Sequence, residues 1–327
     1  MADSVETPEP AEQGMSLVPV PATKGFAEAS RATLAFLQDR IPFGLWVITR
    51  KVGKSWLVLQ VEDRGYSIAA GSVLHWSDTL CERMVEGLGP NVAPRVADIP
   101  AYAAAPMGQV MPIGAYIGVP LELPDGTLFG TLCGLDAEPK PDLIEGHLPM
   151  LRLVAQLLST IAGAQITRDE QDRAAVRAWS PAETDGLTGL LNRRGWDRYA
   201  ARAEEHCLAL GSQCAAIRLE LDGLQELRVS RPAAADELLQ RAAQALLTAT
   251  RGKDAVARLE GDELGVLVVG LAEPGIRMVA DRIQTMLTRA GTTATIGVRM
   301  RKMGNSVDDT IAGADRAMVA RKSVVSR

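Results

Sequence analysis

Acidic residues gather at two places in the C-terminal half of the chain, with spacings that suit metal-assisted phosphate chemistry. Glu220 and Asp222 close a predicted strand, and Asp262 and Glu263 lie in the turn of a predicted hairpin. Alternation along a strand places Glu220 and Asp222 on one face. Clustered carboxylates are how proteins hold Mg²⁺ against nucleotide phosphates. A solvated acidic rim accounts for the same spacing equally well.

The elements that would position these carboxylates alternate between strands and helices. Apolar periodicity predicts, in order, a strand at 215–221, a helix at 233–250, a hairpin of 255–259 and 264–269, a helix at 276–290 and a strand at 293–298. This βαββαβ order predicts a ferredoxin-like or polymerase-palm core. In such a core the end of the first strand lies beside the hairpin turn, so the four carboxylates should converge.

The N-terminal half predicts a second sheet with flanking helices, which makes the whole chain α+β. The predicted elements are a helix at 26–37, strands at 45–49 and 56–61, a helix at 80–86, an irregular stretch at 89–112, and strands at 115–121 and 128–135. Pro124-Asp125-Gly126 between the last two strands has hairpin chemistry, because Gly supplies a positive φ.

Four segments are expected along the chain. They are a disordered leader at 1–24, a first folded domain at 25–142, a connecting helix at 143–179 and a second folded domain at 180–327. The connecting helix carries apolar residues spaced 3-4-3, at Leu151, Val154, Leu158 and Ile161. Such a stripe predicts a helix that pairs with its copy in a homodimer.

Composition narrows the class of protein. The 327 residues are 47% hydrophobic and 23% charged, which is enough for two domain cores. A formal net charge of −5 argues against nucleic acid as a partner, because phosphate backbones need clustered Lys and Arg. The four cysteines form no CxxC pair, so buried reduced thiols are expected. The absence of a signal-peptide pattern or a membrane-length apolar run predicts a cytoplasmic protein without a membrane span.

Two motifs carry a resemblance to a known family over roughly 180–327. Residues 185–194 read DGLTGLLNRR and residues 257–264 read ARLEGDEL, similar to the opening and signature motifs of GGDEF domains of diguanylate cyclases. That family condenses two GTP molecules into cyclic di-GMP with Mg²⁺ or Mn²⁺, one GTP in each subunit of a dimer. The resemblance implies functional positions for metal (Glu220, Asp262), catalysis (Asp262, Glu263) and substrate (Asp236, Gly261, Lys322, Arg228). Among the substrate positions, Lys322 matches a phosphate-contacting Lys, Asp236 matches an Asp that hydrogen-bonds guanine, and Arg228 stands where the family has a guanine-binding Asn.

Four departures from the family pattern oppose catalysis. Glu260 replaces the first Gly of the signature, so a carboxylate and a Cβ stand where backbone should approach phosphate. Glu220 replaces an Asp, and Arg228 replaces a guanine-binding Asn and so offers no acceptor. The following loop at 230–235 is one residue short and lacks the family's Gly-His pair. These changes predict weak or absent cyclase activity.

A regulatory motif of the family is retained better than the catalytic one. Arg251 and Asp254 match its RxxD product-inhibition site, with five residues between Asp254 and Glu260. An Arg fork can clamp a phosphate or a guanine edge, and Asp can accept hydrogen bonds from guanine. The resemblance therefore implies cyclic di-GMP binding here. The alternative is purely structural, with an Arg at the end of a helix and an Asp just before a strand.

The N-terminal half resembles GAF domains at 77–81, 114–121 and 125–133. A ligand pocket would be lined by Trp76, Cys81 and Tyr116, with Trp46, Tyr102 and Phe129 as further aromatic candidates, although plain core packing accounts for them too. The identity of the ligand is not given by these motifs. A redox or bilin-attachment role for Cys81 has little support, because no neighbouring cation or resolving Cys is evident in the sequence. A role for His75 as a haem or metal ligand has equally little support.

Three functions follow as hypotheses. The first is a cyclic di-GMP signalling protein in which a GAF sensor controls a catalytically degenerate GGDEF domain that binds cyclic di-GMP. The second is an active diguanylate cyclase, and the third is a scaffold that binds no nucleotide. In the first two, GTP or cyclic di-GMP is the small-molecule partner, and the chain dimerises through the GAF-like domain and the connecting helix.

Overall fold

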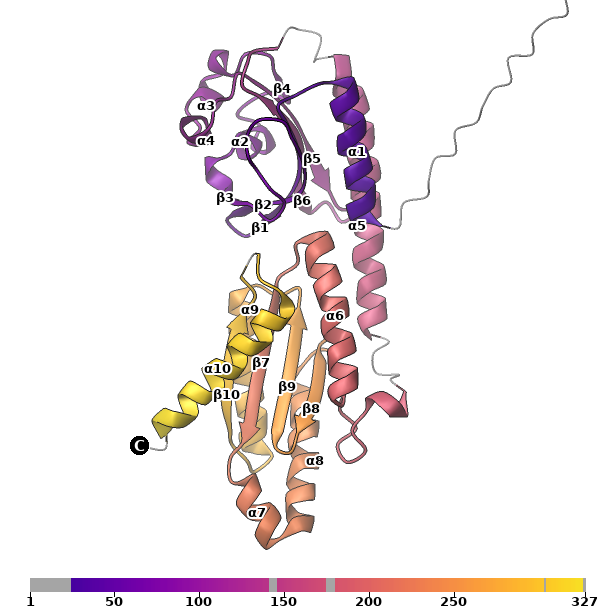
Figure 1. Ribbon diagram of the computed structural model, residues 1–327, viewed down its shortest axis with the longest axis vertical. Coiled ribbons are helices and arrows are strands. Elements are labelled where there is room, and N and C mark those ends of the chain that lie inside the picture. Colours follow the sequence, from indigo (N-terminus) through magenta and orange to yellow (C-terminus); the bar gives the residue numbers. More distant parts are fainter. Residues whose placement is uncertain (1–24, 141–145, 175–179, 303, 326–327) are drawn as a thin grey trace, which may run out of the picture.

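The structure, a computed structural model, describes residues 25–140, 146–174, 180–302 and 304–325 (Figure 1). The long helix α5 (Leu148–Ala174) connects an N-terminal domain with a C-terminal domain. The predicted leader at 1–24 lies outside the described residues. The last part of the predicted connecting helix, 175–179, lies outside them as well.

An antiparallel sheet of six strands forms the N-terminal domain, in the order β3-β2-β1-β6-β5-β4. The strands are β1 (Leu45–Val52), β2 (Ser55–Asp63), β3 (Val73–His75), β4 (Val92–Ala93), β5 (Ala115–Glu122) and β6 (Leu128–Asp136). Both predicted hairpins are confirmed, and Gly126 has the expected positive φ of 82°. Strands β3 and β4 were not predicted because two or three residues carry no readable alternation.

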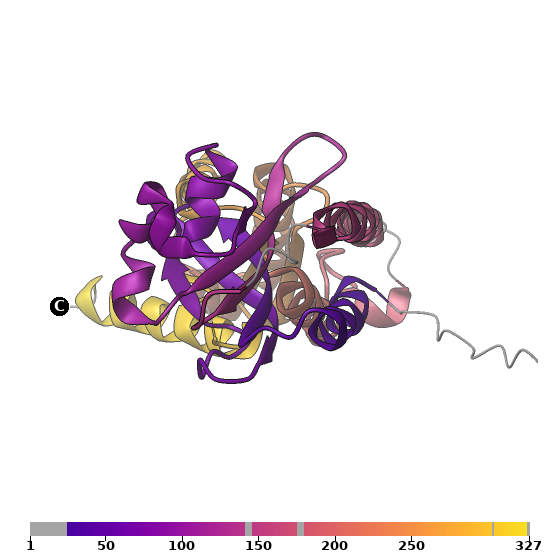
Figure 2. The ribbon, with the colours of Figure 1, turned by 90° about the horizontal axis from the view of Figure 1, so that it is seen from above.

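Helices cover both faces of this sheet (Figures 1 and 2). Helix α1 (Phe26–Arg40) and α5 lie on one face. The other face carries α2 (Leu80–Val85), α3 (Pro100–Ala103) and α4 (Met107–Val110), with 3₁₀ turns at Trp76–Asp78 and Val96–Asp98. The six aromatic and Cys residues predicted for one pocket are divided between these faces. Trp46 and Phe129 pack beneath α1 and α5, whereas Trp76, Cys81, Tyr102 and Tyr116 pack on the opposite side.

The apolar stripe of α5 packs mainly on the N-terminal domain of its own chain. Leu151 and Leu158 are buried against the N-terminal sheet, and Val154 and Ile161 pack partly against the same core. Leu153 and Leu157, by contrast, are exposed. Among the described residues, Leu148–Gln171 is the one segment whose length and hydropathy would suit a membrane span, a criterion that the core helices of water-soluble domains also meet.

The C-terminal domain confirms the predicted βαββαβ core. Its antiparallel sheet has the order β10-β7-β9-β8, with strands β7 (Cys214–Leu221), β8 (Ala255–Glu260), β9 (Glu263–Val269) and β10 (Ala294–Met300). Helices α8 (Pro232–Ala249) and α9 (Glu273–Arg289) pack on one face. Helices α6 (Arg193–Leu210) and α10 (Val307–Val325) pack on the other, and α7 (Leu224–Ser230) links β7 to α8.

Candidate functional site

The end of β7 brings together two residues assigned to metal and phosphate. Glu220 stands opposite Glu263 of β9 and Thr295 of β10, near the C-terminal end of the inner strand β7. The Nζ atom of Lys322, from α10, lies 2.5 Å from Oε1 of Glu220, and this hydrogen bond raises the pKa of Lys322. The structure therefore places the predicted metal-binding carboxylate and the predicted phosphate-binding lysine side by side.

A buried arginine holds the predicted catalytic Glu263. Arg218 lies two residues before Glu220 on β7 and is 4% exposed. Its Nη2 atom lies 2.7 Å from Oε2 of Glu263, and its Nε donates to Oδ1 of Asp315 on α10. The three members of this triad lie far apart along the chain, so local spacing could not reveal them.

The other two carboxylates have separate surroundings, so the predicted convergence of four is not observed. Asp222 accepts hydrogen bonds from the hydroxyls of Thr293 (2.7 Å) and Thr295 (3.2 Å). Asp262 is buried, and its backbone carbonyl accepts from the Leu221 amide. Within the described part of the chain, no three His, Cys, Asp or Glu side chains lie close enough to form a metal site by themselves.

Mg²⁺ does not require such a cluster, because it is commonly held by one or two carboxylates together with substrate phosphates and water. Glu220 and Asp262 supply oxygen donors of the right type, so the residues fit the ion that this chemistry uses. The Lys322 ammonium competes for Glu220 in this structure. A phosphate group that attracted Lys322 would make Glu220 available.

The signature turn between β8 and β9 is fixed by two arginines. Gly261 has a φ of 51°, in the left-handed region that favours glycine. Its carbonyl accepts from Nε of Arg258 at 3.1 Å and from Nη2 of Arg228 at 3.3 Å. Arg258 also binds the carboxylate of Asp185, which ties the turn to the DGLTGLLNRR segment. Glu260 is exposed at this turn.

Arg228 and Asp236, the two residues assigned to guanine, lie on different helices. Arg228 is on α7 and contacts the signature turn. Asp236 is exposed near the start of α8. In this structure the Arg228 guanidinium therefore stabilises the turn itself.

The RxxD residues form an internal ion pair. The Arg251 guanidinium donates to both carboxylate oxygens of Asp254, at 2.6 and 3.1 Å, and to the carbonyl of Val269 at 3.0 Å. The side chain of Asp254 is 0% exposed and that of Arg251 is 30% exposed. These contacts use Nε and Nη2, so the Nη1 end of Arg251 has donors left for a ligand.

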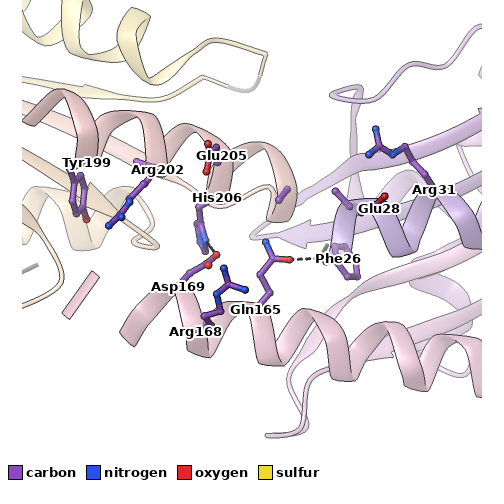
Figure 3. A pocket seen from close by; sticks show the side chains of 14 residues that line it. Phe26, Glu28, Arg31, Gln165, Arg168, Asp169, Tyr199, Arg202, Glu205 and His206 are labelled. Atoms are coloured by element: carbon purple, nitrogen blue, oxygen red, sulfur yellow. Dashed lines mark hydrogen bonds and ion pairs between the residues drawn. The ribbon is translucent and has the colours of Figure 1, made fainter. Parts of the chain in front are cut away.

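A second candidate site is a cavity of about 500 Å³ between the two domains, lined by α1, α5 and α6 (Figure 3). His206 of α6 lies at its centre, with Nδ1 2.5 Å from Oδ2 of Asp169 on α5 and Nε2 2.8 Å from Oγ of Ser212. Arg50 of β1 donates to the Leu210 carbonyl and to Ser212. This polar chain was not predicted, because it joins residues of three elements distant in sequence.

The residues predicted to line a ligand pocket in the N-terminal domain are packed against one another. Trp76, Cys81 and Tyr116 are all buried in one apolar cluster, in which the Tyr102 and Tyr116 rings lie edge to face at 5.3 Å. His75 is exposed on β3. The four cysteines are all buried and none is in a disulfide, as predicted.

Comparison with known proteins identifies the C-terminal domain. Residues 182–325 match the family described as diguanylate cyclase, GGDEF domain. The chain is 25% identical over 217 residues to the diguanylate cyclase DgcP of Escherichia coli, and 29% identical over 239 residues to an uncharacterised signalling protein of Caulobacter vibrioides. The GGDEF domain of DgcB from Caulobacter crescentus, solved in complex with c-di-GMP, is 22% identical with a TM-score of 0.42, covering 44% of this chain and 92% of that one.

These matches differ in extent. The alignment with DgcP covers 65% of this chain and 61% of DgcP, and the alignment with the Caulobacter signalling protein covers 63% and 30% respectively. The chain thus spans less than two thirds of either relative. The DgcP match is also longer than residues 182–325 alone can account for.

Proposed function

Because residues 182–325 are a GGDEF domain of the diguanylate cyclase family, we propose that the chain is a cytoplasmic cyclic di-GMP signalling protein with a weak or inactive output domain. In this proposal the N-terminal domain is a GAF-like sensor, and cyclic di-GMP binds at Arg251 and Asp254. The six-stranded antiparallel sheet of the N-terminal domain, with helices on both faces, supports the GAF-like assignment.

The observation that carries this proposal is the position of Glu260. Its carboxylate stands in a turn whose backbone is held through the Gly261 carbonyl by Arg228 and Arg258. These bonds keep the backbone of Glu260 at the turn, so its negative charge stays near the place where a phosphate would approach. Asp262 and Glu263 follow directly, and like charges oppose the binding of an anionic phosphate.

A specific observation also favours the active cyclase as a second candidate. Glu220 and Lys322, the positions of the metal ligand and the phosphate ligand, are adjacent at 2.5 Å. A carboxylate and an ammonium group are thus both present at the end of β7 where the family places its metal and phosphate ligands. Turnover of GTP by the unmodified protein decides between the two candidates.

Condensation of two GTP molecules needs two GGDEF domains face to face, so we also propose a homodimer. Since the inner stripe of α5 packs on its own N-terminal domain, the pairing surface is the outer face of that helix. Leu153 and Leu157 are 57% and 56% exposed there, one turn apart. Their exposure supports pairing with a second copy.

Cyclic di-GMP binding tests the receptor part of the proposal. We expect calorimetric titration to detect binding by the wild-type protein, and the double variant Arg251→Gln/Asp254→Asn to lose affinity by roughly tenfold or more, because charge-assisted hydrogen bonds contribute ~1.5–3 kcal/mol. The double change is preferable to Arg251→Ala, which would leave the Asp254 carboxylate buried and unpaired.

The matched control for this titration is Arg289→Gln, which removes an exposed Arg at the end of α9. It should bind cyclic di-GMP like the wild type. If the double variant bound cyclic di-GMP as tightly as the wild type, the ligand would have to bind at another site. No binding by the wild type would favour the nucleotide-free scaffold.

Signal transfer between the domains is proposed to run through the C-terminal half of α5. Asp169 contacts His206, and Oε1 of Glu170 lies 2.5 Å from Nζ of Lys253, which joins α5 to the C-terminal domain. One residue inserted after Gln165 should rotate both carboxylates by about 100° and break these pairs. We expect faster amide hydrogen exchange in α6, measured by mass spectrometry.

The control for the insertion is one residue added to the 124–126 turn, in the hairpin of β5 and β6. That change lengthens an exposed turn of the sensor-like domain and should leave exchange in α6 as it is. If the insertion after Gln165 also left α6 unchanged, α5 would not be the coupling element.

A further inference from the structure

Two cysteines of the N-terminal domain that are 52 residues apart in sequence meet in its core. Cys81 is the second residue of α2, and Cys133 lies in the middle of β6. Their Sγ atoms are 3.3 Å apart, and the residues are 3% and 0% exposed. A disulfide requires about 2.05 Å, so the sulfurs would have to approach by little more than 1 Å.

Hydrogen-bond donors gather around the sulfur of Cys81 within this apolar cluster. The hydroxyl of Tyr116 donates to it at 3.6 Å, and Oγ1 of Thr131 lies 3.9 Å from Sγ of Cys133. Among the described side chains, the buried Nε1 of Trp56 has no partner at hydrogen-bond distance. A nearby donor favours the ionised form of a buried sulfur, whereas the apolar surroundings by themselves oppose it.

The two sulfurs differ in how readily they ionise. Burial opposes ionisation of Cys81, but hydrogen bonding from neighbouring side chains, that of Cys133 first, outweighs it and lowers the pKa of the thiol. The hydrogen bond to Cys81, together with burial, raises the pKa of Cys133 well above its usual value. Cys81 is thus the nucleophile of the pair, and Cys133 is its protonated partner.

We propose that Cys81 and Cys133 are a thiol redox site that is oxidised to a reversible disulfide by hydrogen peroxide. The Cys81 thiolate attacks one peroxide oxygen, the O–O bond breaks, and the departing hydroxide takes up a proton to leave as water. Cys133 then loses its proton and attacks the sulfur of the sulfenic acid, the S–O bond breaks, and a second water leaves. The peroxide gains two electrons, one from each sulfur.

The disulfide would join α2 to β6 next to the strand that contacts the other domain. Cys133 pairs with Val47 of β1, and the same strand carries Arg50, which binds Leu210 and Ser212 of the C-terminal domain. A structural change at Cys133 on oxidation would therefore reach the C-terminal domain through the neighbouring strand β1. This consequence rests on the proposed function, whereas the disulfide itself does not.

The test is oxidation of the folded full-length protein by stoichiometric hydrogen peroxide, followed by alkylation, digestion and mass spectrometry. We expect a linked peptide of Cys81 and Cys133, lighter by two hydrogens than the separate peptides and released by dithiothreitol. The variant Cys207→Ser/Cys214→Ser, which lacks the other two thiols, should give the same peptide. The oxidised protein should unfold at a temperature several degrees higher, roughly as expected for a closed loop of about 50 residues.

Two further variants keep the proposal falsifiable. Cys133→Ser should leave a sulfenic acid on Cys81 that dimedone traps, and Tyr116→Phe should slow oxidation roughly severalfold by removing a donor to the thiolate. A linked peptide that forms only after unfolding in urea, or none at all, would overturn the proposal. Cyclic di-GMP binding, measured on the same reduced sample, reports separately on the proposed function.

Discussion

Replacing Glu260 by Gly is expected to raise the production of cyclic di-GMP from GTP by about tenfold to hundredfold. Two like charges 4 Å apart interact by ~1 kcal/mol in water and ~4 kcal/mol at a partly shielded surface, and each 1.36 kcal/mol is about tenfold in rate. Glu260 is exposed at the turn where a phosphate would approach. The measurement is the initial rate of cyclic di-GMP formation with Mg²⁺, compared with the wild-type protein.

Glu260→Gln separates charge from shape, because it removes the carboxylate and keeps the Cβ and the length of the side chain. If Gln restores as much activity as Gly, charge repulsion is the limiting defect. If only Gly restores activity, the Cβ is in the way of the nucleotide. Equal inactivity of both variants would show that residue 260 does not limit turnover, and would point to Glu220 or Arg228.

The second large effect is expected on stability. Replacing Arg218 by Met should lower the free energy of unfolding by about 2–3 kcal/mol, because it leaves Glu263 and Asp315 facing each other without their shared cation. The estimate is below the range for fully buried pairs because both carboxylates are partly exposed. Urea unfolding, followed by circular dichroism, gives the difference directly.

The control for Arg218 comes from the same domain. Arg277 pairs with Glu273 on α9, and both side chains lie mostly in solvent. Arg277→Met should therefore change stability by at most about 0.5 kcal/mol. Equal losses in the two variants would mean that the Arg218 triad contributes no more than an ordinary surface pair.

The strands and helices that build the active-site scaffold could be predicted because their signals are local. Apolar alternation marked β7, β8 and β9, and the motifs at 185–194 and 257–264 stood in the right order. Helices α6 and α10 were not assigned from periodicity. The buried residues of α6 include Trp196, Tyr199, Ala203, Cys207 and Leu210 at helical spacing, a signal that could have located this helix.

The contacts that define the sites could not be predicted, because they depend on pairings across the fold. Arg218 reaches Glu263 and Asp315 over 45 and 97 positions. Cys81 seemed to lack a resolving partner because Cys133 follows 52 residues later on another element. The predicted aromatic pocket was wrong for Trp46 and Phe129, because their places on β1 and β6 turn them to the opposite face of the sheet.

Turnover of GTP by the wild-type protein distinguishes a degenerate GGDEF domain from an active cyclase. The protein would be incubated with GTP and Mg²⁺, and in parallel with Mn²⁺, and the nucleotides separated by chromatography. We expect no cyclic di-GMP, or at most a trace that Glu260→Gly increases. Robust conversion of GTP by the wild-type protein would contradict this expectation and establish an active cyclase that tolerates Glu260.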